Sequence, residues 1–213
     1  MARSKFKDIR EGIAGAVAIG IALLTPFLRS RRVRWGATDA EVNRSLPGDQ
    51  LVPNPKGGYT HAITIRTPHQ QVWPWVAQIG QGRSGFYSYD FLENLVGCNI
   101  HSVDRIVPEF QHNEASEGLR LHPKMPPMPI ATIESGRTLL FSVRMDPDTP
   151  LTWLFFLEEP NERTTRLIVR WLFDYKPSLL KKIGYGLLLE SIACVMGRKM
   201  VLGIKQRAEA AGK

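Results

Sequence analysis

The sequence of 213 residues contains only two cysteines, Cys98 and Cys194. Neither belongs to a CxxC pair, and no group of cysteines and histidines has the spacing of a zinc site. Free cysteines are usually buried as small apolar side chains, so the pattern favours two free thiols. Spacing alone leaves a disulfide between them open, because it does not say whether the two side chains meet.

Motifs of the common catalytic classes are absent as well. The sequence has no GxSxG nucleophile elbow, no glycine-rich phosphate loop and no Cys/His nucleophile arrangement. Among the histidines, only His101, His112 and His122 could converge in a curved sheet, and none has an evident orienting carboxylate. Asp90 and Glu93 lie three residues apart, a spacing that surface helices carry routinely. The sequence therefore predicts no metal, no cofactor and no catalytic residue.

The net charge of +8 is unevenly distributed. Residues 1–34 hold eight Lys and Arg against two acidic residues, and residues 181–213 hold seven against two, whereas the region between them is slightly acidic. No run of basic residues interleaved with aromatic residues marks a nucleic-acid platform. A basic excess at both ends fits a membrane surface better than a nucleic acid.

Only one long charge-free apolar run is present, over residues 12–28, and its seventeen residues are near the lower limit for crossing a bilayer. Basic residues flank both sides, more closely after the run. The sequence Pro26-Phe27-Leu28-Arg29 argues against signal-peptide cleavage. We therefore predict that residues 1–34 form a single-pass membrane anchor with a cytoplasmic domain. A membrane-surface or hairpin element and a buried soluble helix remain alternatives.

Residues 35–58 are predicted to be a connecting segment, and residues 59–213 a single α+β domain. Alternating and three-four apolar spacings predict its elements. In order, these are a strand over 59–66, short helices over 68–79 and 88–96, a strand over 118–122, hairpins of 130–134 with 138–145 and of 151–158 with 164–175, and a long terminal helix over 178–211. Gly184 and Gly186 move the expected start of the regular helix to near Leu187.

Short motifs along this order resemble one bacterial branch of the START/Bet v 1-like superfamily, which is also described as polyketide cyclase/dehydrase and lipid transport. The residues that carry the resemblance are Trp35-Gly36-Ala37-Thr38, Leu46-Pro47-Gly48-Asp49, Val72-Trp73-Pro74-Trp75, Gln78-Ile79-Gly80, the run Arg83 to Asp90, Pro108-Glu109-Phe110-Gln111, and the stretch from Arg198 to Glu209. The chain departs from its relatives at Ser116-Glu117-Gly118-Leu119, where they tend to carry Gly-Asp.

The resemblance implies the helix-grip fold, a curved antiparallel sheet around a long C-terminal helix, with a hydrophobic cavity between them. Candidate lining residues of that cavity are Trp75, Phe86, Tyr87, Tyr89, Trp153, Phe155, Arg170, Met196 and Met200. Arg166 and Arg170 share strand parity, so they face the same side. That side is either a polar floor of the cavity or a solvated face.

The leading functional hypothesis is a membrane-tethered, non-catalytic domain that binds or transports a lipid, isoprenoid or polyketide-like ligand in its cavity. The expected partners are a hydrophobic small molecule or lipid and a membrane, and no nucleic acid; the oligomeric state stays open. Two alternatives are a cyclase or dehydratase with acid-base residues in the cavity, and an assembly factor without a ligand.

Overall fold

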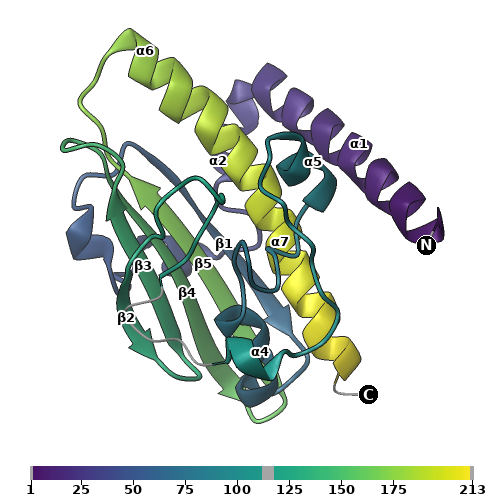
Figure 1. Ribbon diagram of the computed structural model, residues 1–213. Coiled ribbons are helices and arrows are strands. Elements are labelled where there is room, and N and C mark those ends of the chain that lie inside the picture. Colours follow the sequence, from purple (N-terminus) through teal and green to yellow (C-terminus); the bar gives the residue numbers. More distant parts are fainter. Residues whose placement is uncertain (1, 112–117, 212–213) are drawn as a thin grey trace.

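The computed structural model describes residues 2–111 and 118–211. The fold is α+β, with one five-stranded antiparallel sheet in the order β1-β5-β4-β3-β2 and a long C-terminal helix across one face (Figure 1). The strands are β1 (Gly57–Ile65), β2 (Ile130–Glu134), β3 (Thr138–Arg144), β4 (Pro150–Asn161) and β5 (Thr164–Phe173). The predicted α+β class, the antiparallel sheet with a long C-terminal helix, and both hairpins are therefore confirmed.

The helices are distributed over both ends of the chain and the connection after β1. They are α1 (Ala2–Leu24), η1 (Pro26–Leu28), α2 (Arg29–Arg32), α3 (Asp39–Asn43), η2 (Asp49–Leu51), α4 (His69–Ala77), α5 (Asp90–Leu95), η3 (Pro108–Phe110), α6 (Leu179–Lys181), η4 (Lys182–Leu189) and α7 (Glu190–Ala211). Figure 1 shows α1 running beside α7 along the outer side of the molecule.

Two predicted elements differ from the structure. The segment 118–122 is not a strand; Leu119 forms only an isolated bridge with Met128. The terminal helix begins with Ser178, whose hydroxyl accepts from the Lys181 amide (3.2 Å), and continues as the π-helix η4 through the two glycines. The regular α-helix starts at Glu190, slightly later than Leu187, because the wider π turns take up the glycine-containing stretch.

The face of the sheet that meets α7 carries a row of aromatic side chains. Tyr59 of β1 pairs with Trp171 of β5, Trp171 pairs with Trp153 of β4, and Trp153 pairs with Phe141 of β3. Strand residues directly opposite each other on one face are close enough to pack. These rings, together with buried Met200 of α7, belong to the main apolar core.

The opposite face of the sheet is covered by residues 35–58. Leu46 from this segment packs with Ala62, Leu140, Leu154 and Phe156 in a second, smaller core. The predicted connecting segment is therefore part of the packed domain. Because strand side chains alternate, this face carries the intervening residues of β5, which include both Arg166 and Arg170.

Arg170 is held on this outer face and does not face α7. Its guanidinium donates to the Asp49 carboxylate (2.5 Å) and the Thr60 hydroxyl (3.1 Å). It also donates to backbone carbonyls of the connecting segment: Glu41 (2.6 Å), Val42 (3.0 Å) and Arg44 (3.1 Å). The prediction that Arg170 lines the space between the sheet and the terminal helix is therefore wrong, because the strand register turns it the other way.

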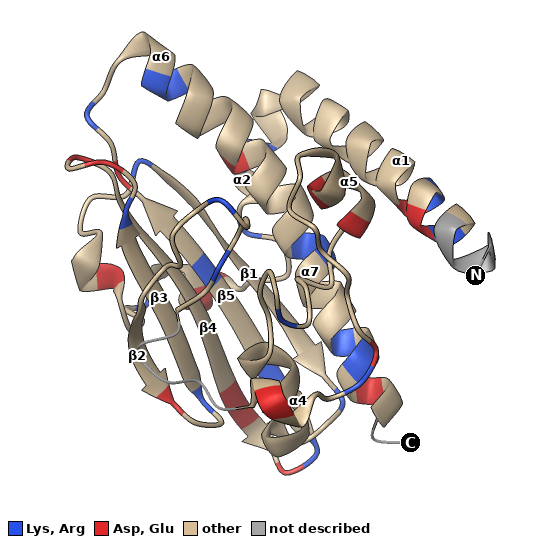
Figure 2. Cartoon of the chain, viewed as in Figure 1, with Lys and Arg blue, Asp and Glu red and all other residues tan. Residues whose placement is uncertain are grey.

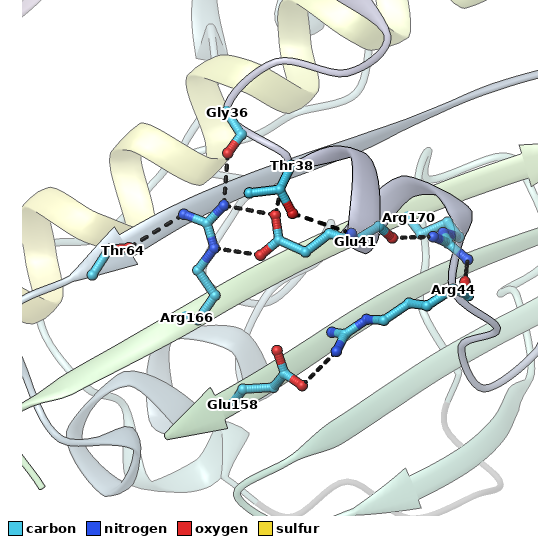
Figure 3. Close-up of polar contacts among 8 residues, drawn as sticks. All are labelled: Gly36, Thr38, Glu41, Arg44, Thr64, Glu158, Arg166 and Arg170. Atoms are coloured by element: carbon cyan, nitrogen blue, oxygen red, sulfur yellow. Dashed lines mark hydrogen bonds and ion pairs between the residues drawn. The ribbon is translucent and has the colours of Figure 1, made fainter. Parts of the chain in front are cut away.

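Arg166, four residues before Arg170 on the same face of β5, makes a similar attachment (Figure 3). It forms a two-bonded ion pair with Glu41 (2.7 and 2.9 Å) and donates to the Gly36 carbonyl (2.7 Å). Glu41 also closes a capping box with Thr38 at the start of α3. The Arg166 guanidinium is the main cause that lowers the pKa of Glu41 to about 2. The two arginines thus fasten α3 and η2 to the sheet.

The N-terminal apolar run does not form one straight helix. Helix α1 ends at Leu24, and η1 with α2 continues after a bend of 95° between residues 6–24 and 26–32. Among the described residues, no single helix is long and apolar enough to cross a membrane, although this bent pair passes the same test together. Proline lacks the amide hydrogen that would continue the helix, so Pro26 begins a new one.

Helix α1 contacts the domain near its middle, and the bend that follows it makes a second contact. Its residue Gly12 lies against Phe91, and Gly15 lies against Tyr89 and Leu92 of the α5 region. At the bend, Arg29 forms a double ion pair with buried Glu190 at the start of α7 (2.5 and 2.7 Å). Glu190 also accepts from the Gly58 amide (2.8 Å), so one carboxylate joins α2, β1 and α7.

Removing Arg170 tests whether it fastens the connecting segment. Arg170→Ala leaves the Asp49 carboxylate and several carbonyls without their donor, so we expect the free energy of unfolding to fall by about 3 to 5 kcal/mol. Urea denaturation followed by circular dichroism measures it. Arg144→Ala, at an exposed arginine that bonds only a loop carbonyl, should change stability by less than about 0.5 kcal/mol. Equal effects of the two substitutions would contradict the assignment.

Buried His61 should make stability depend on pH. Burial lowers the pKa of His61 to about 4, while its Nε2 donates to the Arg32 carbonyl (2.9 Å). An unfolded histidine binds a proton near pH 6.5, so the unfolded state takes up the proton first and stability falls as the pH drops from about 6.5 to 4. We expect His61→Gln to remove up to about 3 kcal/mol of that dependence, whereas His122→Gln should not. Denaturation midpoints at several pH values decide this.

Candidate ligand-binding site

A cavity of about 640 Å³ lies between the N-terminal half of α1, the segment 87–91, the loop 101–104 and the C-terminal half of α7. We call it the α1 cavity. Trp75, Tyr87 and Tyr89, three of the predicted lining residues, contribute to its wall together with Phe91. The volume suits a small molecule, and the rest of the wall consists mainly of polar and charged side chains.

Trp75 carries the clearest unused hydrogen-bonding group of this cavity. The side chain is 98% buried, and its ring stands edge-on to Tyr87 with centroids 6.0 Å apart. Within the described residues, its indole nitrogen is buried and has no hydrogen-bond partner. A buried donor without a partner costs free energy, and no acceptor among the described residues offsets that cost.

Tyr87 is placed by an unusual backbone and by a glycine of α7. Its φ is +56°, a left-handed value that non-glycine residues adopt only infrequently. A Cβ atom at Gly203 would lie 2.3 Å from the Tyr87 carbonyl oxygen, so α7 can approach this backbone only where it has glycine. The Tyr87 hydroxyl accepts from Gln78 Nε2 (2.8 Å), and burial raises its pKa to about 12. The phenol therefore keeps its proton at neutral pH.

Charged residues of both signs also line this cavity. Figure 2 shows acidic and basic positions in the N-terminal part of α1 and in the C-terminal part of α7. Lys199 of α7 pairs with Glu11 of α1 (2.8 Å) and lies over the Tyr89 ring (5.5 Å). Arg207 pairs with Asp104 (2.7 Å) and lies over the Tyr87 ring (4.5 Å). These contacts tie α1 and the loop 101–104 to α7, and they put cationic groups next to aromatic faces.

The other predicted lining residues do not gather at this cavity. Phe86, Trp153, Phe155 and Met200 belong to the apolar core between the sheet and α7, and Phe155 and Met200 are almost fully buried. Met196 is half-buried on α7, where its carbonyl accepts from the Ser88 hydroxyl (3.0 Å).

Arg170 lies in the wall of a second cavity, of about 610 Å³, on the opposite face of the sheet. Its other charged lining residues are Arg29, Arg34, Arg44, Lys56 and Asp49. Each of the cations forms an ion pair with an acidic side chain. The positive charge of this cavity is therefore already balanced, and it offers less to a ligand than the α1 cavity.

The histidines and carboxylates that the sequence offered as possible catalytic groups lie in different parts of the structure. His101 and Asp90 line the α1 cavity, where Asp90 accepts from the Ser102 amide (2.6 Å) and hydroxyl (2.7 Å). Burial, with a smaller contribution from Asp90, raises the pKa of Glu93 to about 8. His122 contacts the Val96 carbonyl (3.2 Å). His112 and the departure at Ser116 and Glu117 lie outside the described residues.

Cys98 and Cys194 are free thiols, as the sequence pattern favours. In the part of the chain that the structure describes, no group of three or more His, Cys, Asp or Glu side chains is arranged to hold a metal ion. The α1 cavity thus presents aromatic surface, one unused N–H donor and paired charges. This set of groups can bind and orient a small molecule.

Sequence reasoning missed the contributions of Lys7, Glu11, Lys199 and Gly203 to the cavity. The first two lie in the segment that was assigned to the membrane anchor, so they were not considered as site residues. A signal was present in the spacing of Gly12 and Gly15, because small residues three apart mark a helix face that packs closely against another element.

Comparisons with known proteins give similarity to solved structures only. No family model and no curated protein matches the chain. A conserved protein from Geobacillus kaustophilus is 11% identical, with a TM-score of 0.40 over 71% of this chain and 95% of that one. The self-sacrificing resistance protein CalC from Micromonospora echinospora is 12% identical, with a TM-score of 0.36 over 73% and 93%. The aromatase/cyclase Zhui from Streptomyces sp. R1128 is 12% identical, with a TM-score of 0.29 over 73% and 95%.

Proposed function

We propose that this chain is a membrane-tethered, non-catalytic domain that binds an amphipathic small molecule with a large apolar part, such as a lipid, isoprenoid or polyketide-like compound. The observation that carries the proposal is the α1 cavity, whose wall contains Trp75, Tyr87, Tyr89 and Phe91 beside charged side chains. The buried Trp75 indole nitrogen has no hydrogen-bond partner within the described residues. The resemblance to the START/Bet v 1-like superfamily supports the same class of ligand.

Binding would combine two effects. Each square ångström of apolar ligand surface taken out of water contributes roughly 25 cal/mol, so burial against Tyr87, Tyr89 and Phe91 would contribute to the affinity. A hydroxyl, carbonyl or carboxylate of the ligand would accept from the Trp75 indole and fix the orientation. Lys199 and Arg207 are paired with Glu11 and Asp104, so the charged part of the wall would contact a polar head group without selecting its charge.

The tether in this proposal is the N-terminal segment. Its apolar residues are flanked by basic residues on both sides, and α1 forms one wall of the α1 cavity. A membrane contact through α1 would therefore hold the cavity close to a source of apolar ligands. The basic residues 29–34 would add attraction to anionic head groups.

A cyclase or dehydratase reaction requires an acid or base that titrates near neutral pH and faces the cavity. The lining residue with a shifted pKa is Tyr87, which burial moves to about 12, away from that range. Tyr87 itself therefore does not supply that acid or base. An assembly role without a ligand would leave the Trp75 donor unexplained.

The indole N–H of Trp75 should contribute directly to affinity. Trp75→Phe keeps an aromatic ring but removes the donor, so we expect a dansyl-labelled fatty acid to bind about fivefold more weakly, in line with about 1 kcal/mol for one hydrogen bond. Trp73→Phe, on the same helix but outside the cavity wall, is the matched control. Fluorescence titration measures both, and an unchanged affinity of Trp75→Phe would remove the donor from the proposal.

Filling the cavity should abolish binding without unfolding the domain. Ala210 lies in the cavity wall on an exposed part of α7, so Ala210→Trp should occupy the space at little cost in stability. We expect at least about a tenfold loss of probe affinity, whereas Leu202→Trp, on α7 but away from the cavity, should bind normally. Mass spectrometry of molecules co-purifying with wild type and Ala210→Trp gives a second readout. An apolar compound retained equally by both proteins would place the ligand elsewhere.

A further inference from the structure

The packing of α1 is inverted relative to a helix on a water-exposed surface. Its largest apolar side chains are exposed and follow one ridge at spacings of three and four: Phe6, Ile9, Ile13, Val17, Ile21 and Leu24. Ile13 is 58% exposed and Leu24 is 82% exposed. The face that packs against the domain carries small residues instead, with Gly12, Gly15 and Ala22 buried.

This inversion indicates which medium surrounds the ridge. In water, an amphipathic helix turns its large apolar residues toward the protein and its polar residues outward. In lipid, large apolar side chains can face the surroundings, while small residues allow close helix contacts. Gly12 shows how tight the contact is, since a Cβ atom there would lie 2.3 Å from the Phe91 ring. The exposed apolar ridge of α1 is therefore suited to contact with an apolar medium.

A second exposed apolar segment lies at the start of the terminal helix. Leu179 and Leu180 of α6 are 75% and 83% exposed, and Ile183, Leu188 and Ile192 are also exposed. The Arg29–Glu190 pair joins the bend after α1 to the first residue of α7, next to this segment. In Figure 1, α6 and η4 extend past the edge of the sheet, on the same side of the sheet as α1.

Basic residues accompany both apolar segments. Arg10, Arg31 and Lys182 are exposed, and they lie next to the α1 ridge, the α1 bend and η4 respectively. Each Lys or Arg near an anionic membrane surface contributes about 1 kcal/mol of attraction. Charge and apolar exposure therefore occur together, which is the composition of a helix that lies in a membrane interface.

We propose that α1 lies in the plane of an anionic bilayer surface, with its ridge and the exposed residues of α6 and η4 inserted among the lipids. A spanning α1 would be surrounded by lipid on all sides, but its small-residue face is already occupied by α5 and α7. The bend of 95° after residue 24 likewise suits a helix that stays on one side of the bilayer. This inference rests on the proposed membrane tether and specifies its geometry.

Vesicle partitioning tests the surface. We expect the full chain to bind vesicles of phosphatidylcholine with phosphatidylglycerol more tightly than phosphatidylcholine alone. The double substitution Ile13→Ser with Val17→Ser should lower the partition coefficient by about tenfold or more. A control pair of exposed apolar residues away from α1, α6 and α7, Ile133→Ser with Leu51→Ser, should leave it unchanged. Equal binding by both double variants, or by both vesicle types, would overturn the inference.

Depth measurements separate a surface helix from a spanning one. A fluorophore is attached in turn to Ile13→Cys, Val17→Cys and Ile21→Cys in a Cys98→Ser background, where Cys194 is buried and its pKa is raised by burial to about 12. A helix in the plane gives the same shallow depth at all three positions when quenched by brominated lipids. A spanning helix gives depths that change steadily along it, and that result would overturn the inference.

These measurements use vesicles without added ligand, whereas binding to the α1 cavity is measured in the absence of vesicles. A loss of membrane binding with intact probe binding therefore refutes the docking geometry alone. The reverse result refutes the ligand site alone.

Discussion

The close contact between α1 and the rest of the domain is the constraint on which the functional part of the structure depends. Gly12 and Gly15 leave no room for a side chain beside Phe91, Tyr89 and Leu92, so α1 can dock in only one rotational setting. That setting turns the large apolar residues outward and brings Lys7 and Glu11 to the α1 cavity. One packing choice thus produces both the cavity wall and the exposed ridge.

The sheet is stabilised differently on its two faces, and the strand alternation explains the division. The residues that face α7 are aromatic and aliphatic and form the main core, whereas the intervening residues of β5 include two arginines. A buried guanidinium is stable only where carboxylates and carbonyls surround it. The segment 35–58 supplies these acceptors through Glu41, Asp49 and its backbone, so it covers a face that would otherwise be solvated.

Much of the domain could be predicted from local patterns. The errors arise where contacts between distant segments determine which way a side chain or a helix faces. Alternating residues and turn signals identified four of the five strands in the two hairpins, and Tyr59 marked the remaining one. The parity of Arg166 and Arg170 was recognised, but the face they share depends on what covers the sheet, which no local pattern states. Likewise, the composition of residues 12–28 indicated an apolar medium, whereas the docking of α1 depends on its contacts with α5 and α7.

Only the aromatic residues of the candidate site could be predicted, because the other residues reach it through contacts between distant segments. Trp75, Tyr87 and Tyr89 lie on neighbouring elements of one segment, so local reasoning could group them, while Lys199 and Gly203 reach the site from the far end of the chain. The long-range contacts also link the two proposals physically. Because Glu11 pairs with Lys199 across the cavity, any displacement of α1 by lipids changes that pair and the space beside Tyr89. Both proposals therefore depend on the same helix, because α1 carries the exposed apolar ridge and also lines the α1 cavity.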